Sequence, residues 1–360
     1  MKTIKILFLT AILVALCNID AHSAEVKYVD ANTLNLIGRI SPTAKAYARV
    51  DTAIYNDLTA YQKNLVTDSP GMALTFKTNS SQIKIKSFFK WYASTYNQTG
   101  INVYGYDLYI KKNGEWLYAY SNSPKSSGKE FTLIEDMDDS EKECLLYLPS
   151  FCHVDSISVG VDAGAKIEAM PNPFRHRVLV FGSSYTHGTS ANRSGMSYPM
   201  IMERDLGIYI MSLGVSGNSK LQQTFARVIA DTPVDALIFD TFSNPSAQEI
   251  EERFEPFLKT VRAAHPNVPM IFLQTLYREG RNFNQKVDAH EKAKMEAAER
   301  VVRNAMKTDK NIYFLNYENI TGDNHATSTD GVHPSALGYY HMAKTWGPQI
   351  KKILGKYGIE

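Results

Sequence analysis

A serine-rich turn follows the apolar run at residues 177–181 and reads Gly182-Ser183-Ser184-Tyr185-Thr186-His187-Gly188. A glycine permits a sharp exit from a strand. A serine on such a turn is the nucleophile of acyl transfer when a base lies beside it. The alternatives are a plain turn or a phosphate-binding loop, although neither GxxxxGK nor GxGxxG is present. From these residues alone, Ser183 and Ser184 are both candidate nucleophiles.

A second group of reactive side chains lies near the C-terminus, in the run Asp330-Gly331-Val332-His333-Pro334. A serine nucleophile needs a base of near-neutral pKa and a carboxylate that orients this base and stabilises its charged form. Asp330 and His333 can supply both. One alternative is a helix start capped by Ser335. The other is a metal site, which would need more ligands, and the nearby Asp323 and His325 show no HExxH-like spacing. We predict neither a metal nor another cofactor.

Two further positions, Gly217 and Asn244, each follow an apolar run. Negative charge that develops on an ester oxygen needs hydrogen-bond donors, such as a backbone N–H beside a glycine and a side-chain amide. Taken singly, each position is also typical of an ordinary turn. The carboxyl ends of parallel strands share one edge of a sheet, and active sites lie there. We therefore expect Gly217 and Asn244 to converge with Ser184 and His333.

The elements that must position these groups alternate between strands and helices. Apolar runs suit strands buried on both faces of a parallel sheet, and they span residues 177–181, 208–213, 234–239, 270–273 and 312–315. Helical patterns cover residues 198–206, 220–230, 248–264, 288–307 and 335–354. Five such units predict a doubly wound α/β domain at residues 173–360.

Residues 25–172 predict a separate β-sandwich domain, because short apolar runs recur between turn signals and no helical stripe is present. The expected strands are residues 73–78, 81–92, 106–111, 116–121, 142–148 and 156–161. Twelve of the 21 tyrosines lie in this part, which fits strand propensity or a sugar-facing surface. Trp91 and Tyr92, together with Tyr185, are candidate substrate contacts, although core or strand-surface positions also account for them.

The first 24 residues have the pattern of a secretory signal peptide. Lys2 and Lys5 precede the apolar run Ile6–Cys17, which is too short to span a bilayer. We expect a secreted or periplasmic protein without a transmembrane segment. The alternative is an outer-membrane lipoprotein anchored at Cys17, but Leu16 is larger than the residue that usually precedes a lipidated cysteine.

The composition excludes several classes of protein. The 360 residues, 44% hydrophobic and 21% charged, are not those of a disordered, collagen-like or coiled-coil chain. A net charge of +2 indicates no nucleic-acid partner. Cys144 and Cys152 could pair in an oxidising compartment. We expect free thiols, because these cysteines lie at opposite ends of one apparent strand, which would hold them apart. Asn97 also stands in an Asn-x-Thr glycosylation pattern.

Taken together, these blocks resemble those of the SGNH, or GDSL-type, hydrolases, which are named for Ser, Gly, Asn and His. Two further runs are similar to a subgroup that reads PGM and NLGFSGN, namely Gly195-Met196-Ser197-Tyr198 and Ser212-Leu213-Gly214-Val215-Ser216-Gly217-Asn218. In the front half, Gly105-Tyr106-Asp107-Leu108-Tyr109 resembles the GxDLY motif of a β-sandwich domain that precedes SGNH esterase domains. The resemblance covers nearly the whole chain after the signal peptide.

This resemblance implies a jelly-roll-like β-sandwich followed by a flavodoxin-like three-layer α/β/α domain with a five-stranded parallel sheet. It implies a catalytic triad of Ser184, Asp330 and His333, with Ser184 favoured over Ser183 by alignment to Gly-x-Ser. The implied oxyanion hole consists of the backbone N–H groups of Ser184 and Gly217 and the side-chain amide of Asn244. The block around Asn244 departs from the usual GxND, since it reads Asp240-Thr241-Phe242-Ser243-Asn244-Pro245.

Resemblance and export signal together imply a secreted serine esterase that removes O-acyl groups, above all O-acetyl groups, from oligo- or polysaccharides. One alternative is an SGNH esterase of the lipase or lysophospholipase type, which would need a long apolar groove. The other is a catalytically silent glycan-binding protein, and the presence of Ser184, Asp330 and His333 together argues against it.

Overall fold

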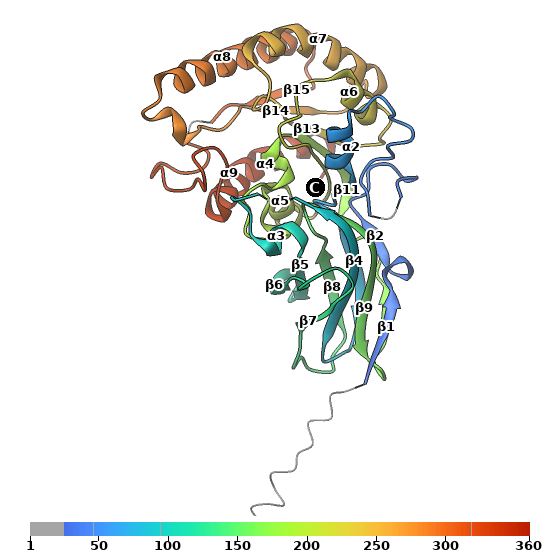
Figure 1. Cartoon of the computed structure of the whole chain (residues 1–360). Helices are drawn as coiled ribbons and strands as arrows, with labels where there is room; N and C mark the ends of the chain where they lie inside the picture. Colours follow the sequence, from blue (N-terminus) through green and yellow to red (C-terminus); the bar gives the residue numbers. More distant parts are fainter. Residues whose placement is uncertain (1–24, 46, 94, 318) are drawn as a thin grey trace, which may run out of the picture.

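The computed structural model describes residues 25–45, 47–93, 95–317 and 319–360. The expected signal peptide, including Cys17, lies outside the described residues. A β-rich part is stacked against an α/β part (Figure 1). Within the described ranges, no helix has the length and apolar character needed to cross a membrane.

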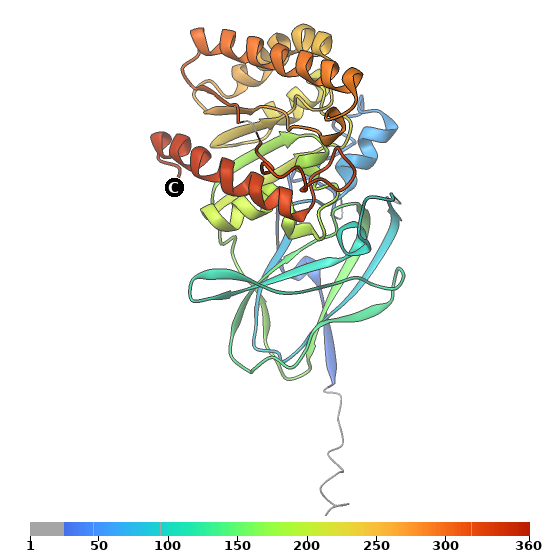
Figure 2. The ribbon, with the colours of Figure 1, turned by 90° about the vertical axis from the view of Figure 1, so that its left-hand side faces the viewer.

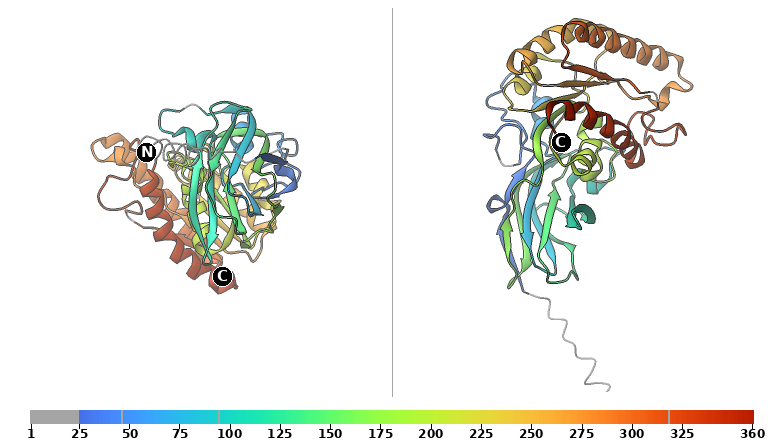
Figure 3. Two further views of the ribbon diagram at one scale, coloured as in Figure 1. Left: turned by 90° about the horizontal axis from the view of Figure 1, so that it is seen from below. Right: turned by 180° about the vertical axis from the view of Figure 1, so that it is seen from behind.

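The front part consists of two antiparallel sheets. The first has the strand order β1-β9-β4-β7, with the bounds β1 Val26–Asp30, β4 Ile83–Tyr92, β7 Glu130–Ile134 and β9 Cys152–Asp162. The second has the order β10-β3-β8-β5-β6, with β2 paired to β3. Its bounds are β2 Asn35–Ile37, β3 Ala73–Thr78, β5 Tyr106–Lys112, β6 Glu115–Asn122, β8 Lys142–Tyr147 and β10 Ile167–Ala169. Figure 3 shows these strands from below and from behind.

Alternating side chains of both sheets meet in a buried core, as a sandwich requires. Ile85 and Val159 come from the first sheet, and Leu74 and Leu146 come from the second. The prediction of a β-sandwich at the N-terminal end is therefore confirmed.

The two cysteines are free and buried, as expected, but the reason differs from the prediction. Cys144 lies on β8 and Cys152 begins β9, so the two residues belong to different strands of different sheets. The interpretation of one strand between them was wrong, because the turn at residues 148–151 separates β8 from β9.

The front part also contains two short helices, α2 Ala60–Thr67 and α3 Gly100–Tyr104, which the sequence pattern did not predict. In α2, a capping box between Thr59 and Gln62 satisfies the first backbone N–H groups. Its buried apolar residues are only Leu65 and Val66, which is too few to produce a helical stripe in the sequence.

The rear part is built on a parallel sheet with the strand order β12-β11-β13-β14-β15. The bounds are β11 Arg175–Gly182, β12 Ile208–Gly214, β13 Ala236–Asp240, β14 Met270–Leu273 and β15 Ile312–Leu315. In chain order this is 2-1-3-4-5, the flavodoxin-like arrangement. The predicted fold class of this part is confirmed.

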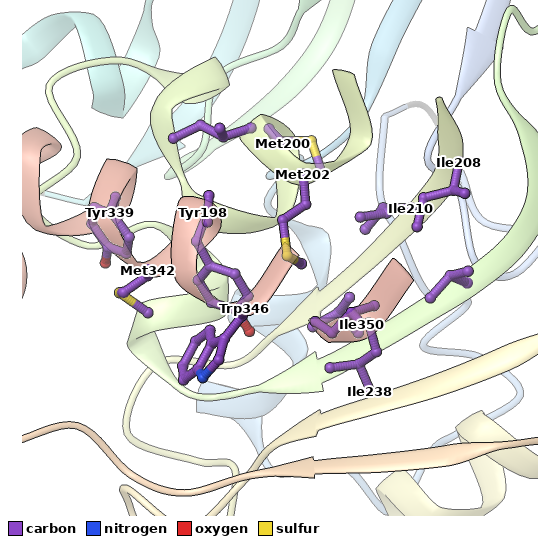
Figure 4. Packing of buried hydrophobic residues seen from close by; sticks show 14 of the residues in the cluster. Tyr198, Met200, Met202, Ile208, Ile210, Ile238, Tyr339, Met342, Trp346 and Ile350 are labelled. Carbon is purple, nitrogen blue, oxygen red and sulfur yellow. The ribbon is translucent and has the colours of Figure 1, made fainter. Parts of the chain in front are cut away.

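Helices cover both faces of the parallel sheet. In Figure 2, the sheet lies between α8 in orange and α9 in red. Their bounds are α4 Ser184–His187, α5 Tyr198–Leu206, α6 Gln223–Ala230, α7 Ala247–Ala264, α8 Gln285–Thr308 and α9 Ala336–Leu354. On one face, α5 and α9 meet through Tyr198 and Trp346, whose ring centroids are 5.2 Å apart. Figure 4 shows these two residues in one buried hydrophobic cluster with Ile210 and Ile238 of the sheet.

A segment from the front half joins the core on the other face of the sheet. Tyr55, Leu65 and Val66 pack in one cluster with Phe181 of β11 and Phe225 of α6. Front residues therefore help to build the α/β part, and α2 is brought beside the carboxyl edge of its sheet. The division of the chain at residues 24 and 172 stays a prediction.

Candidate active site

Ser184 lies at the carboxyl end of β11, at the start of the single-turn helix α4. The turn begins at Gly182, where any larger residue would collide with the side chains of Thr186 and Asp240. Ser183 caps the turn, because its Oγ accepts a hydrogen bond from the Tyr185 N–H. The chain must therefore bend sharply after the strand, and this bend presents Ser184 at the sheet edge.

The loop before α9 is held in a closed turn by the side chain of Asp330. Its Oδ1 accepts hydrogen bonds from the backbone N–H groups of Val332 and His333, at 2.9 and 2.7 Å. The carbonyl of His333 in turn accepts from the Thr329 N–H and the Ser328 hydroxyl. The backbone of His333 is thereby fixed in place.

Ser184, His333 and Asp330 form one hydrogen-bonded chain. His333 Nδ1 lies 2.8 Å from Asp330 Oδ2, and His333 Nε2 lies 3.0 Å from Ser184 Oγ. Burial opposes ionisation of Asp330, but hydrogen bonds from His333, Asn97 and Val332 outweigh it and hold the pKa of this carboxyl well below its usual range. An ionised Asp330 requires a proton on Nδ1, so Nε2 is left to accept the Ser184 proton.

Three candidate hydrogen-bond donors for an oxyanion belong to residues that line one cleft. Gly217, with a φ of +71°, and Asn244 line the same cleft as Ser184. Asn244 Oδ1 accepts a hydrogen bond from the Ser219 N–H at 3.1 Å, which identifies Nδ2 as the amide donor. Within the described part of the chain, the N–H groups of Ser184 and Gly217 and the Asn244 Nδ2 have no hydrogen-bond acceptor. They are available to an oxyanion.

The cleft above Ser184 has a volume of about 610 Å³ and is lined by both parts of the molecule. Its rim carries three aromatic side chains from the front half, Tyr61, Trp91 and Tyr96, which are 58%, 40% and 92% exposed. Trp91, which the sequence analysis named as a candidate substrate contact, thus lines the cleft. The rim residues come from α2, the end of β4 and the loop after it.

The other two candidate substrate contacts lie elsewhere. Tyr92 packs against Phe89 and Tyr104, with centroid distances of 6.0 and 5.3 Å, and does not line the cleft. Tyr185 is fully buried, and its ring meets the His333 ring edge-on at 5.9 Å. Its hydroxyl donates to the Val332 carbonyl at 3.1 Å. A side chain without exposed surface cannot touch a substrate, so Tyr185 supports the histidine loop instead.

Sequence reasoning missed two polar residues of the cleft, Asn97 and Arg278. Arg278 donates to Tyr185 Oη at 3.1 Å and forms an ion pair with Glu291 at 3.0 Å. Asn97 Nδ2 donates to Asp330 Oδ2 at 2.8 Å. Arg278 lies in no recognisable motif, the Asn-x-Thr pattern at Asn97 does not point to a catalytic role, and Asn97 is separated from Asp330 by 233 positions. No local signal in the sequence could have associated them with the site.

A buried carboxyl lies beneath the nucleophile turn. Burial raises the pKa of Asp240 to about 7, although Thr186 and Ser183 donate hydrogen bonds to it. The hydroxyl distances are 2.9 Å for Thr186 and 3.2 Å for Ser183. Asp240 therefore connects the turn to the end of β13.

Among the described residues, no group of three or more His, Cys, Asp or Glu residues is arranged to hold a metal ion.

Comparison with protein families gives matches in both parts of the chain. The model of the GDSL-like lipase/acylhydrolase family matches residues 175–351. A second model, GxDLY, which describes the N-terminus of SGNH-hydrolase-type esterases, matches residues 26–167. A search of curated proteins finds no match.

Solved structures resemble most of the chain. A GDSL-like lipase structure from Bacteroides ovatus ATCC 8483 is 40% identical, has a TM-score of 0.89 and covers 92% of this chain and 98% of its own. The salicylyl-acyltransferase SsfX3 of a tetracycline biosynthetic pathway is 18% identical, with a TM-score of 0.75 and coverages of 93% and 99%. A family two carbohydrate esterase from Cellvibrio japonicus is 14% identical, with a TM-score of 0.58 and coverages of 92% and 99%.

The last two likenesses concern the fold alone, whereas the first extends to sequence over nearly the full length of both chains. The resemblance inferred from the sequence blocks is confirmed: this chain belongs to the GDSL-like lipase/acylhydrolase family, the SGNH hydrolases, and carries a GxDLY-type N-terminal domain.

Proposed function

We propose that this protein is a serine esterase that hydrolyses O-acetyl esters on carbohydrates through an acyl-enzyme. The observation that carries the proposal is the hydrogen-bonded chain from Ser184 through His333 to Asp330 at the floor of an open cleft. Membership in an acylhydrolase family supports ester chemistry at this site.

In the first half-reaction, Ser184 Oγ attacks the ester carbonyl carbon while His333 Nε2 takes the hydroxyl proton. Asp330 stabilises the imidazolium that forms. The carbonyl oxygen becomes an oxyanion, which accepts hydrogen bonds from the N–H groups of Ser184 and Gly217 and from the Asn244 amide. The imidazolium then gives its proton to the leaving alcohol oxygen as the C–O bond breaks, and the acyl group remains on Ser184.

In the second half-reaction, water takes the place of the alcohol. His333 removes a proton from the water as its oxygen attacks the acyl carbon, and the same donors stabilise the second oxyanion. Collapse of this intermediate returns the proton from His333 to Ser184 Oγ and releases the carboxylic acid. No group beyond the chain's own residues and water is needed for these steps.

The rim of the cleft favours a carbohydrate as the alcohol part of the ester. Exposed Tyr61, Trp91 and Tyr96 offer apolar ring faces beside polar groups. Two such groups, the side chains of Asn64 and Gln98, line the same cleft. Sugars present alternating C–H faces and hydroxyl groups, which match this mixture. The names of the family two carbohydrate esterases with the same fold point in the same direction.

The expected location of the protein agrees with such a substrate. The N-terminal 24 residues have the pattern of a secretory signal. We propose that the mature protein is secreted or acts in the periplasm. An exported enzyme can act on oligo- and polysaccharides outside the cytoplasm.

Acetate release from a panel of acetylated oligosaccharides tests the proposal, with Ser184→Ala as the key variant. We expect this variant to lose at least about 10³-fold in kcat, because the nucleophile is removed. Ser183→Ala is the matched control, since Ser183 Oγ points to Asp240 at 3.2 Å rather than to His333. It should keep more than about a tenth of the activity, because a helix cap contributes only ~1 kcal/mol to stability.

Three results would contradict the proposal. If Ser184→Ala retained near-normal turnover, the nucleophile would be wrong. A strong preference for octanoyl over acetyl esters would favour the lipase or lysophospholipase alternative. Binding of acetylated glycans without any acetate release would favour a catalytically silent binding protein.

A further inference from the structure

Three consecutive side chains of the front part reach across to the catalytic part just before α3. Asn97 Nδ2 donates to Asp330 Oδ2 at 2.8 Å. Gln98 Oε1 accepts from the Ser190 N–H at 3.1 Å. Thr99 Oγ1 donates to the carbonyl of residue 192 at 2.7 Å. Residues 97–99 are thereby attached both to the histidine loop and to the chain that follows the nucleophile.

Asn97 differs from its two neighbours because its partner belongs to the reacting chain of hydrogen bonds. Its Nδ2 lies 2.8 Å from the same carboxylate oxygen that accepts the His333 Nδ1 proton, and 3.4 Å from Nδ1 itself. Together with the two backbone donors on Oδ1, this contact gives the Asp330 carboxylate four hydrogen bonds.

We propose that Asn97 is a positioning residue of the triad, by which the β-sandwich domain completes the catalytic site. Its amide occupies the second acceptor position of Asp330 Oδ2, so the carboxylate cannot rotate away from His333. The amide also withdraws electron density from the carboxylate, which limits how strongly Asp330 attracts the imidazole proton. This inference rests on the proposed function, because it assigns Asn97 a role in the same reaction.

A purely structural role would not require an asparagine facing the carboxylate. Gln98 and Thr99 already attach this segment to the catalytic part through partners outside the triad. The Gln98 side chain also accepts from Asn102 Nδ2 at 2.8 Å, which anchors it to α3. The Asn97 bond is therefore not needed to hold the segment in place.

Other titratable groups lie around the Asp330–His333 pair. Tyr185 packs on the His333 ring, and Tyr339 interacts electrostatically with Asp330. The ionisable residues Arg278 and Asp68 line the same cleft. All four are left unchanged in the variants below, so a shift in pH dependence reports on Asn97.

The test compares Asn97→Ala and Asn97→Asp with two controls. Thr99→Ala removes the bond to the carbonyl of residue 192 and the side-chain cap of α3 without touching the triad. Asn113→Asp adds the same charge at the β5–β6 turn, where the left-handed backbone, with a φ of +54°, also suits aspartate. The measurements are kcat and KM for p-nitrophenyl acetate between pH 5 and 9, and circular dichroism to verify folding.

For Asn97→Ala we expect kcat to fall about 10-fold or more, as is typical for losing a hydrogen bond to a charged group, while KM changes less than about 2-fold. For Asn97→Asp we expect the acidic limb of the kcat/KM profile to move about one unit to higher pH, because a second carboxylate favours the imidazolium. Thr99→Ala and Asn113→Asp should leave this limb in place.

A second readout needs no ester turnover. In the Ser184→Ala background, the NMR titration midpoint of the His333 ring should move to higher pH when Asn97→Asp is added. A midpoint that does not move would overturn the positioning role. So would an equal loss of kcat in Asn97→Ala and Thr99→Ala, together with an acidic limb that does not shift in Asn97→Asp. Failure of the wild-type protein to turn over esters in a Ser184-dependent way would instead overturn the proposed function.

Discussion

Asp107 and Arg193 form a largely buried ion pair across the junction of the two parts, with Arg193 Nη1 2.8 Å from Asp107 Oδ2. The same oxygen accepts the Gly195 N–H at 2.8 Å. A Cβ at Gly195 would lie 2.7 Å from this oxygen and from the Tyr109 ring. The GxDLY motif thus interlocks with the Gly-Met run of the catalytic part. Its aspartate joins the two parts and does not belong to the reacting groups.

Replacing Asp107 should destabilise the whole molecule. Asp107→Ala leaves the Arg193 guanidinium without its partner in a largely buried site, and we expect a loss of about 3 kcal/mol in the free energy of unfolding. Urea unfolding followed by circular dichroism measures this. Asp139→Ala, at an exposed turn, is the control and should change stability by less than about 0.5 kcal/mol. Equal stability of the two variants would contradict a role for the pair.

The buried Glu203 should make stability depend on pH. Burial raises the pKa of Glu203 to about 8, whereas a glutamate in the unfolded chain titrates near about 4.3. The folded protein therefore binds this proton more tightly. Its contribution to stability is present below the unfolded pKa and is lost as the pH rises through about 8.

Glu203→Gln should remove this dependence while keeping the hydrogen bonds. Glu203 accepts from the Tyr147 hydroxyl at 2.8 Å and from the Ile210 N–H at 3.1 Å, and a glutamine amide can bond to both groups. We expect the Tm of the variant to rise relative to wild type between pH 5 and pH 8. Asp240 is present in both proteins, so its titration cancels. Glu296→Gln, at an exposed position, is the control, and a constant Tm difference for Glu203→Gln would refute the expectation.

Asn244 should act on the chemical step. Asn244→Ala removes the amide donor from the oxyanion, and we expect kcat to fall about 10²–10³-fold while KM changes little. Steady-state kinetics with p-nitrophenyl acetate measures both constants. Ser219→Ala keeps the backbone N–H that orients Asn244 and loses only a hydroxyl contact to Thr241, so it serves as the control. If kcat of Asn244→Ala stayed within about 10-fold of wild type, Asn244 would not contact the oxyanion.

The aromatic rim should matter for large substrates only. Trp91→Ala and Tyr96→Ala remove ring faces from the cleft, and we expect KM for acetylated oligosaccharides to rise about 5-fold or more, corresponding to roughly 1 kcal/mol of binding. KM for p-nitrophenyl acetate, which is too small to reach the rim, should stay within about 2-fold. Tyr120→Ala, an exposed tyrosine on β6, is the matched control. A parallel rise for both substrates would argue against a sugar-binding rim.

Much of the fold was predictable because its signals are local. The apolar runs of β11, β13 and β14 and the helical periodicity of α7 and α8 follow directly from side-chain spacing. The strands β1, β2, β7 and β10 and the helices α2 and α3 were not predicted. They are short, and neighbours distant in the sequence stabilise them. The α2 segment, for example, buries Leu65 and Val66 beside Phe181 and Phe225 of the catalytic part.

The sequence by itself determined the candidate groups of the site. Each of its reactive groups stands in a short block at a strand end or a helix start, and local geometry presents Ser184 and His333 at the same sheet edge. Only the tertiary structure decided what surrounds them. Asn97 meets Asp330 across 233 positions, Trp91 reaches the rim, and Tyr185 turns inward. Such contacts depend on how two separately patterned parts pack together, and side-chain packing between distant segments leaves no periodic signal in the chain.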